Sequence, residues 1–430
     1  MQTSWASRTR KAWHNAMRQG VALLPTALRH KVYRSMVDCN DNPDRKLVLK
    51  IADTREELEA CFALLHDAYV DSGFMKPHPS GLRVTPYHAL PTTTTLCAKY
   101  DGQVVGTISL IREGVFGFPL QTAFDLHGIR SLTGQIAEVS ALAVHPDFRK
   151  TGGAIFFPLM KFMYGYCTRY FDTRHLVIAV HPKRIEFYEA LLFFKRLQDN
   201  VVDKYDFANG APAVGASLDL LAAPDTMRQA YSGKKRRRDL AAYFMDVDLS
   251  NIQWPVRQYH ITNDPVMTPE LLDYFFNQRT PGFAQMDRRH IALLHSIYRD
   301  PAYKACLPPL TADEQTQAGT RRHARYSLHC PGTFAITPQG GGHRYTLDVI
   351  DVSLEGFQAR THSPLPMETW GQADVELGPD THSVLTATAV RDHTVDDDHF
   401  VGFKLSHPDP AWANFIQALE QGTAHIQPGS

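Results

Sequence analysis

The spacing of hydrophobic residues alternates between a two-residue and a 3.6-residue period over residues 47–222. Short apolar runs predict strands, and apolar residues at helical spacing predict amphipathic helices. We therefore expect strands at Leu47–Ile51, Leu96–Lys99, Val104–Ile111, Ile136–Val144, Leu176–Val180 and Ser217–Leu221. Helices are expected directly after Thr54, over Ile155–Tyr170 and over Ile185–Phe194. The order strand, helix, hairpin, strand, helix, strand, helix, strand predicts a mixed sheet flanked by helices.

Two local signals fix element ends in this region. Thr54 followed by Glu57 has the spacing of a capping box, in which the hydroxyl accepts from the backbone of the third helical residue. Asp101-Gly102 between two apolar runs is a strong hairpin signal, because both residues tolerate the positive φ of a tight turn.

The pattern changes after residue 222. Helices are predicted over Met227–Val247, Pro269–Gln278 and Arg288–Tyr298, so residues 223–306 are expected to form a helical extension. Residues 307–319 are polar with two adjacent prolines and read as a linker. Residues 320–425 then carry short alternating strands and a closing helix, at Ala373–Leu377, Ser383–Val390, Phe400–Leu405 and Trp412–Gln421. A small antiparallel β-barrel fits this last pattern, and the whole chain is expected to be α+β.

Composition argues against several classes of protein. The 430 residues have a formal net charge of zero, which argues against a general nucleic-acid binder. The six cysteines are scattered, the 21 histidines fall in no ligand pattern, and no apolar run approaches a membrane span. We therefore expect a cytoplasmic protein with reduced thiols, no metal site and no tightly bound cofactor.

Residues 1–46 are rich in arginine, tryptophan and leucine and are expected to form a basic helical arm. Two interpretations remain open. The arm either packs on the body of the protein, or it touches an acidic partner or the surface of the inner membrane as a basic amphipathic segment.

The stretch Val144–Ala154 carries the first candidate chemistry. Arg149 is followed by Gly152, Gly153 and Ala154 at a strand-to-helix joint, where small residues and a helix N-terminus favour an anion. The motif resembles the pyrophosphate loop of the GNAT superfamily of N-acyltransferases. The resemblance implies that the strand Ser140–Val144 splays from its neighbour, and that a phosphopantetheine donor is held by Leu142, Val144, Arg149, Gly152, Gly153 and Ala154.

Two further runs, Val180–Tyr188 and Glu138–Pro146, refine the resemblance. Glu138–Pro146 looks like the branch that takes acyl chains from acyl carrier protein, which includes autoinducer synthases and long-chain N-acyl amino acid synthases. This implies that Glu138 takes a proton from the acceptor amine and that Tyr188 protonates the departing thiolate. The alternatives are a surface carboxylate for Glu138 and a core aromatic for Tyr188. Ala141 stands where relatives often carry arginine, which puts acceptor recognition in doubt.

The second candidate chemistry lies near the C-terminus. Arg321, Arg322 and Arg325 precede a strand-like run, which is followed by Asp351, Ser353 and Gly356 in a D-x-S-x-x-G pattern. Arginine forks grip or stack on guanine, and Asp351 and Ser353 suit a guanine N–H edge and a phosphate. The two motifs resemble the PilZ domain, which implies that the chain binds cyclic di-GMP.

Three functions follow from these resemblances. The first is a cyclic-di-GMP-responsive N-acyltransferase that uses acyl carrier protein or acyl-CoA and an amino acid acceptor. The second is an inactive acyltransferase fold that serves as a regulatory platform, and the third is an acetyl-CoA-dependent acetyltransferase with the same switch. The basic run Lys234–Arg238 is either a solvated surface or a docking site for acidic acyl carrier protein.

Overall fold

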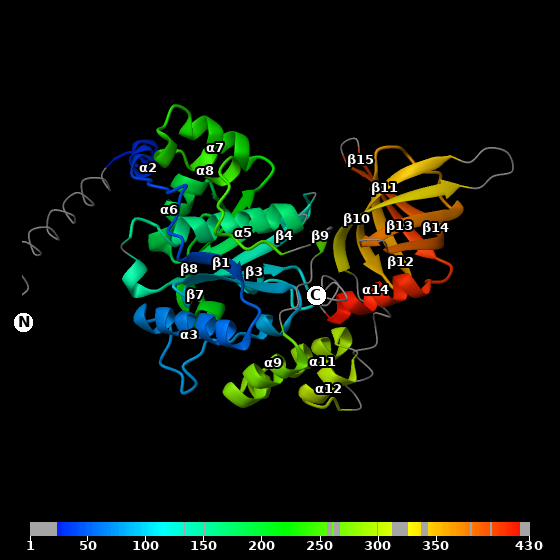
Figure 1. Ribbon diagram of the computed structural model, residues 1–430, viewed down its shortest axis with the longest axis horizontal. Helices are drawn as coiled ribbons and strands as arrows, with labels where there is room; N and C mark the ends of the chain where they lie inside the picture. The colour runs from blue at the N-terminus through cyan, green and yellow to red at the C-terminus, as the bar shows by residue number, and fades with distance from the viewer. Residues whose placement is uncertain are drawn as a thin grey trace, which may run out of the picture.

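The computed structural model describes residues 24–421, apart from 133, 150, 172, 256–259, 262–266, 299, 312–325, 337–342, 379–380 and 396–397. Two sheets of eight and seven strands each enclose a hydrophobic core of their own (Figure 1). The mixed sheet flanked by helices and the C-terminal antiparallel barrel confirm the expected α+β class.

The N-terminal sheet has the strand order β1-β2-β3-β4-β5-β8-β6, with β7 paired to β8. Among the strand pairs of this sheet that the structure describes, β4–β5 is parallel and the others are antiparallel. Five of the six expected strands are present with slightly different ends, whereas the strand expected at Ser217–Leu221 begins six residues earlier, as β8. The bounds are β1 Leu47–Ile51, β2 Thr93–Tyr100, β3 Gln103–Arg112, β4 Gln135–Val144, β5 Thr173–Val180, β6 Lys195–Arg196, β7 Val202–Tyr205 and β8 Ala211–Asp219.

Helices cover both faces of this sheet. On one face, α5 (Phe156–Tyr170) packs through Leu159 and Phe162 into the largest core cluster, together with α6 (Pro182–Leu192). On the other face, α3 (Arg55–Asp71) contacts β2, β3 and β4. The short helices between them are η1 Pro86–Ala89, η2 Pro119–Thr122, α4 His127–Arg130, η3 Pro146–Phe148 and η4 Asp206–Ala208.

The two local signals behave as expected, with one difference. Thr54 caps α3 by accepting the Glu57 N–H at 3.2 Å. The Glu57 carboxylate accepts the N–H of Asp53 and pairs with Lys50 and Lys99, so it joins the helix to the sheet instead of closing the box on the cap residue. Asp101 and Gly102 have φ values of 52° and 84°, as a two-residue hairpin turn between twisted strands requires.

The helical extension corrects two of the predicted helices. The expected helix Met227–Val247 is divided into α7 (Ala223–Tyr231) and α8 (Leu240–Met245). The break follows from Gly233 at a φ of 72° and from the run of like charges after it, and Asp239 then starts α8 by accepting the Ala242 N–H at 2.9 Å.

The expected helix Pro269–Gln278 begins as α9 (Pro269–Asp273) and continues as a π-helix, η6 (Tyr274–Arg279). The expected helix at Arg288–Tyr298 is confirmed as α11 (Arg288–Ile297). Two more helices, α10 (Gly282–Gln285) and α12 (Pro301–Cys306), complete the extension.

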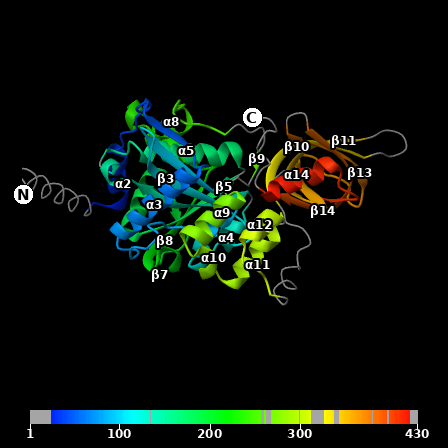
Figure 2. The ribbon, with the colours of Figure 1, turned by 60° about the horizontal axis from the view of Figure 1, so that its bottom comes forward.

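The two parts of the extension pack on different faces of the sheet. Helices α7 and α8 join the α5 cluster, whereas α9 to α12 cover α3 and η1 (Figures 1 and 2). Arg279 pairs with Glu59 of α3 at 2.6 Å, and the buried Tyr298 hydroxyl donates to the Ala89 carbonyl at 2.7 Å. This second part therefore holds the segment that connects α3 to β2.

The C-terminal sheet is a closed ring of six antiparallel strands, because β10 pairs with both β11 and β13. The bounds are β10 Tyr326–Ile336, β11 Arg344–Ser353, β12 Gly356–Thr361, β13 Trp370–Gly378, β14 Thr381–Val395 and β15 Asp398–Leu405. The closing helix is α14 (Pro410–Gln421), and it lies against the barrel in Figure 2. Its Trp412 is fully buried, with the indole N–H donating to the Ser353 carbonyl at 3.0 Å.

One segment links the two sheets. The Gln253 N–H donates to Leu49 of β1 at 2.8 Å, and Trp254 packs against Phe162 of α5. Further along, β9 (His260–Ile261) pairs with β10 and extends the barrel sheet to its seventh strand.

Candidate functional site

The sheet opens between β4 and β5. The parallel register joins Gln135–Glu138 to Thr173–Val177, and the rest of β5 pairs only with β8. Val139–Val144 therefore has β3 on one side and no strand partner on the side of β5. The expected splay is present, and it leaves backbone N–H and C=O groups along one edge that an extended ligand can pair with.

A bulge distorts β4 at the start of this opening. Ser140 pairs with Ser109 and Ala143 with Thr107, so Ala141 and Leu142 together face a single residue of β3. Ala141 adopts a φ of 55°, which costs an L-residue roughly 1 kcal/mol or more. Bulges of this kind re-aim backbone groups beside binding sites. Leu142 and Val144, the expected backbone contacts to the donor, are half-buried at this edge.

The expected phosphate loop lies at the far end of the opening. Gly152 and Gly153 have φ values of 69° and 91°, and a Cβ on Gly153 would approach the Phe157 ring to 2.5 Å. Gly152 and Ala154 are exposed, and no side chain caps the start of α5 at Ile155. Within the first turn of α5, the Phe157 N–H donates to the Gly153 carbonyl at 3.0 Å and Pro158 has no N–H, so an anion here would have to bind the N–H groups of the Gly152–Phe156 segment.

Arg149 lies beside this loop. Its Nε donates to the Val144 carbonyl at 2.8 Å and its Nη1 contacts the Asp71 carboxylate at 3.4 Å. The side chain is about two-fifths exposed, so the guanidinium remains accessible to solvent and to a ligand. The structure thus brings Val144, Arg149 and the Gly152–Ala154 segment together at one end of β4.

Glu138 is the most strongly perturbed acid near the opening. Its side chain is 1% exposed and accepts the Leu120 N–H at 2.9 Å. Burial raises the pKa of Glu138 to about 8, and the hydrogen bond from Leu120 offsets only part of this rise. The alternative of a surface carboxylate is therefore excluded, whereas a base that titrates near neutral pH is consistent with the burial.

Tyr188 lies on the other face of the sheet. Glu138 accepts a hydrogen bond from Leu120, which belongs with Tyr205 to one cluster, while Tyr188 packs on the α5 and α6 cluster and lies edge-on against Phe194 at 5.9 Å. Burial raises the pKa of Tyr188 to about 12, so the hydroxyl keeps its proton at neutral pH. A substrate that reached both side chains would have to pass through the gap between β4 and β5.

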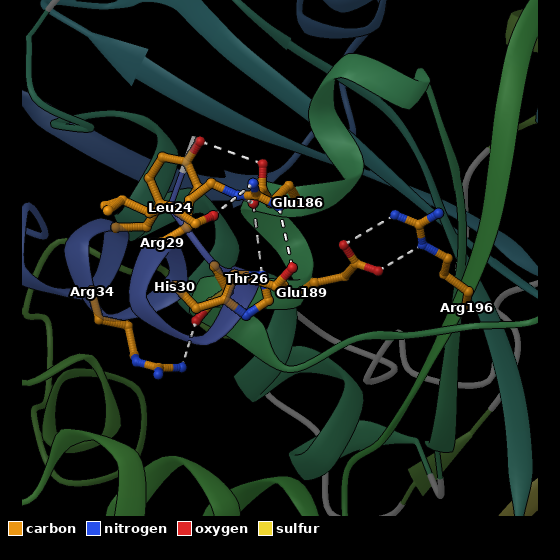
Figure 3. Close-up of polar contacts among 10 residues, drawn as sticks. Leu24, Thr26, Arg29, His30, Arg34, Glu186, Glu189 and Arg196 are labelled. Carbon is orange, nitrogen blue, oxygen red and sulfur yellow. Dashed lines mark hydrogen bonds and ion pairs between the residues drawn. The ribbon is translucent and has the colours of Figure 1, made fainter. Parts of the chain in front are cut away.

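Helix α6, which carries Tyr188, is held from outside by α2 (Thr26–Ser35). Figure 3 shows Arg29 of α2 paired with Glu186. The Arg34 guanidinium donates to the Ala190 carbonyl at 3.1 Å. The described part of the N-terminal arm therefore packs on the body. Residues 1–23 of the arm lie outside the described residues.

A small pocket that the sequence did not indicate lies at the bulge. It is lined by Leu65, Tyr69, Arg83, Thr85, His88, Ser109, Ile111, Ser140, Ala141 and Phe207. These residues come from α3, η1 and its approach, β3, β4 and η4. No motif links them, and only an arginine between apolar residues in Leu82–Val84 could have served as a signal.

The barrel places the second candidate motif at the β11–β12 turn. The Ser353 hydroxyl donates to the Gly356 carbonyl at 3.0 Å, and a Cβ on Gly356 would lie 2.4 Å from the Phe403 carbonyl oxygen. The glycine is thus required by the close approach of β12 and β15. Asp351 is half-buried and pairs in register with Ser327.

Arg321, Arg322 and Arg325 fall outside the described residues. The chain continuing from Arg325 enters β10 at Tyr326, which pairs with Val352. The strand end to which the arginine motif is attached therefore lies next to the D-x-S-x-x-G turn.

The basic run Lys234–Arg238 is exposed and lies next to residues 38–41. Arg236 pairs with Asp41, and Arg237 pairs with Asp38 at 3.0 Å. Two of the five charges are thus partly neutralised within the protein. Among the described residues, no group of three or more potential ligands is placed to hold a metal ion, and no helix has the length and apolarity to cross a membrane.

Comparison with known proteins concerns the N-terminal sheet. The family model of the N-acyl amino acid synthase FeeM matches residues 60–219, and a search of curated proteins found no match. Among solved structures, FeeM from uncultured soil microbes is 22% identical, covering 42% of this chain and 93% of its own at a TM-score of 0.35.

Two other solved structures are similar over the same region. The CoA-dependent acyl-homoserine lactone synthase BjaI is 19% identical over 48% of this chain and 92% of its own, with a TM-score of 0.35. YncA from Salmonella typhimurium, described as a putative acetyltransferase, is 16% identical and covers 41% of this chain and 95% of its own, with a TM-score of 0.29. The family match supports an acyltransferase for residues 60–219, and the barrel lies outside it.

Proposed function

We propose that this protein is an N-acyltransferase that moves an acyl group from a phosphopantetheine thioester to the primary amine of an amino acid, and that cyclic di-GMP regulates it through the C-terminal barrel. One observation carries the first half of the proposal. The strand β4 opens from β5 directly beside buried Glu138 and ends at a glycine loop that starts α5. An extended, phosphate-bearing thioester fits such an edge, and the FeeM family match supports the same chemistry.

In the proposed reaction each group has one role. The thioester arm lies along Val139–Val144, with its phosphate at the Gly152–Ala154 loop and at Arg149. The amine nitrogen loses a proton to ionised Glu138, directly or through water, and attacks the thioester carbonyl. Backbone N–H groups near the Ala141 bulge stabilise the oxyanion. The C–S bond then breaks, and Tyr188 gives its proton to the thiolate that leaves.

The donor and acceptor are tested together. The purified full-length protein is incubated with long-chain acyl carrier protein, long-chain acyl-CoA or acetyl-CoA and a mixture of amino acids, and products are identified by mass spectrometry. We expect long-chain N-acyl amino acids. Product from acetyl-CoA alone would favour an acetyltransferase, and no product from any donor would favour an inactive regulatory platform.

The roles of Glu138 and Tyr188 are tested by near-isosteric variants. Glu138→Gln and Tyr188→Phe should each reduce kcat by about 100-fold or more, because each removes one proton transfer. Glu113→Gln, which alters an exposed carboxylate paired with Arg130, serves as the matched control. Activity retained at the control level in both variants would exclude the mechanism.

The nucleotide half of the proposal rests on the two barrel motifs. The arginine segment adjoins the end of β10 that pairs with Val352, beside Asp351 and Ser353. Calorimetry with cyclic di-GMP should show binding to the wild-type protein and none to Arg321→Ala or Arg325→Ala. Undiminished affinity in either variant would refute the assignment, and acyl-transfer rates with and without the nucleotide would give the sign of regulation.

Acyl carrier protein is the proposed partner of the basic run. Replacing Lys234–Arg238 with neutral residues should raise KM for acyl carrier protein by weakening electrostatic steering. The same variant should use acyl-CoA unchanged, because that donor has no protein surface to dock. Equal effects on both donors, or no effect at physiological salt, would exclude docking at this surface.

A further inference from the structure

The pocket at the β4 bulge contains a buried cation. Arg83 is 9% exposed, and its guanidinium lies over the Tyr69 ring at 4.0 Å and near the Phe207 ring at 5.4 Å. One amino group donates to the Phe207 carbonyl at 2.6 Å. The buried Nε has no hydrogen-bond partner, and Arg83 pairs with no carboxylate in the described part of the chain. Burying a guanidinium without a counter-charge costs free energy, and an anion bound beside it would offset this cost.

The other walls of the pocket supply no anion. Thr85 and His88 satisfy each other, since the Thr85 N–H donates to His88 Nδ1 at 3.0 Å. Burial and the nearby charge of Arg83 lower the pKa of His88 to about 3, so the imidazole is neutral at physiological pH. Ser109 and Ser140 contribute only hydroxyl groups. The positive charge of Arg83 therefore dominates the pocket.

Tyr205 lies near both Arg83 and the proposed base, Glu138. The Tyr205 hydroxyl is buried and has no hydrogen-bond partner among the described residues. Burial raises the pKa of this hydroxyl, the charge of Glu138 adds to the rise and the charge of Arg83 opposes it. Glu138 pairs in register with Ile111, which lines the pocket, and lies two residues before Ser140 on β4, so the proposed base borders the pocket that holds Arg83.

A small molecule with an anion for Arg83 and an amine for Glu138 would use both groups. The proposed place of the donor phosphate is the Gly152 loop, which follows the end of β4 at Val144, and Val144 lies about 13 Å from Ser140 at the rise of an extended strand. The anion at Arg83 therefore belongs to the acceptor. An α-amino acid carries its carboxylate one carbon from the attacking nitrogen, and the planar guanidinium is suited to a carboxylate.

We propose that Arg83 binds the carboxylate of the acceptor and so restricts the reaction to free amino acids, an inference that rests on the acyl transfer proposed above. Carboxylate binding by Arg83 then positions the amine at the β4 bulge. It assigns acceptor recognition to α3, the Leu82–His88 segment and η4, and explains how Ala141 can stand where relatives carry arginine.

Matched acceptors test this without altering the protein. The wild-type enzyme is assayed with amino acids and with their carboxamides, using the thioester donor that gives product. We expect kcat/KM to favour the amino acid by about 100-fold or more, because the carboxamide leaves the buried guanidinium without a counter-charge. Equal use of both acceptors would overturn the proposal.

Variants then identify the residue. Arg83→Gln should lower kcat/KM for the amino acid by about 100-fold and for the carboxamide by less than about threefold, while Arg83→Lys should retain part of the preference. Arg130→Gln, which removes an exposed guanidinium, should change neither. An equal loss with both acceptors in a folded Arg83→Gln protein would show a merely structural role.

Binding without a donor separates this inference from the proposed function. Calorimetry of the wild-type protein should detect the amino acid and not its carboxamide, and Arg83→Gln should lose the difference. If no acceptor is acylated but this pattern is found, acyl transfer fails and the carboxylate site stands. If acylation occurs but the amino acid and its carboxamide bind equally well and react at equal rates, the carboxylate site is refuted and the proposed function stands.

Discussion

Replacing Glu138 with glutamine should remove a pH-dependent loss of stability. Burial holds the pKa of Glu138 at about 8 in the folded protein, against an ordinary value of 4.5. Between these values the unfolded chain has released the proton while the folded chain keeps it. The free energy of unfolding therefore falls as pH rises from about 4.5 through 8, at up to roughly 1.4 kcal/mol per pH unit. Over the whole window the upper limit is roughly 5 kcal/mol.

The glutamine side chain is the matched perturbation. It is isosteric with the protonated acid and can still accept the Leu120 N–H, but it cannot ionise. Urea unfolding of wild type and Glu138→Gln is measured at pH 5, 6, 7 and 8. With each pH unit the free energy of unfolding of the wild type should fall relative to that of Glu138→Gln. The other titrating groups, including those of the barrel, contribute equally to both proteins and cancel. Parallel pH dependences for the two proteins would refute the raised pKa.

The same titration bears on catalysis. At pH 7 only about one molecule in ten carries ionised Glu138, if the pKa is about 8. Acyl transfer should therefore increase by up to about tenfold between pH 7 and pH 9 and level off there, provided that the chemical step limits the rate. In Glu138→Gln the rate should be low at every pH. A purely structural Glu138 would give the stability difference without this change in the rate profile.

Two glycine substitutions test the two halves of the chain. Gly153→Ala should weaken donor binding and reduce stability by about 1 to 3 kcal/mol, because it combines a positive φ with a clash on Phe157. At Gly152 the φ is also positive but a Cβ would meet open space, so Gly152→Ala should cause smaller losses of donor affinity and of thermal stability in the same donor titration and thermal melt. Gly356→Ala should destabilise the barrel by about 2 to 4 kcal/mol, since its Cβ would meet the Phe403 carbonyl. Calorimetric scans should show an earlier barrel transition, with nucleotide-free acyl transfer retained, and a scan unchanged from wild type would contradict the packing argument.

The features that the sequence predicts well are those set by neighbouring residues. Thr54 caps its helix and Asp101-Gly102 turns its hairpin because each acts on backbone groups a few positions away. The glycine loop before α5 belongs to the same class, since positive φ and small size are properties of single residues. Tertiary context decided the helix predicted over Met227–Val247, which divides where a glycine and five basic residues outweigh a helical apolar pattern.

The bulge at Ala141 shows a different limit. A φ of 55° at alanine is unfavourable in isolation, so no propensity argument would place it there. It exists because β4 is held by β3 on one side and leaves β5 on the other, and this depends on the register of three strands. The strand itself was predictable from its apolar pattern, but the direction of its backbone groups was not.

The donor and acceptor parts of the proposed site differ in this respect. The donor part is one continuous segment from β4 to α5, so a motif exposes it. The acceptor part gathers Arg83, Ser109, Ser140 and Phe207 from four elements that only the fold brings together. Substitutions in the Leu82–His88 segment or in η4 can therefore change the pocket without touching the phosphate loop. Acceptor preference should vary independently of donor use, and a change at Arg83 that altered donor KM alone would show that the two parts have been assigned the wrong way round.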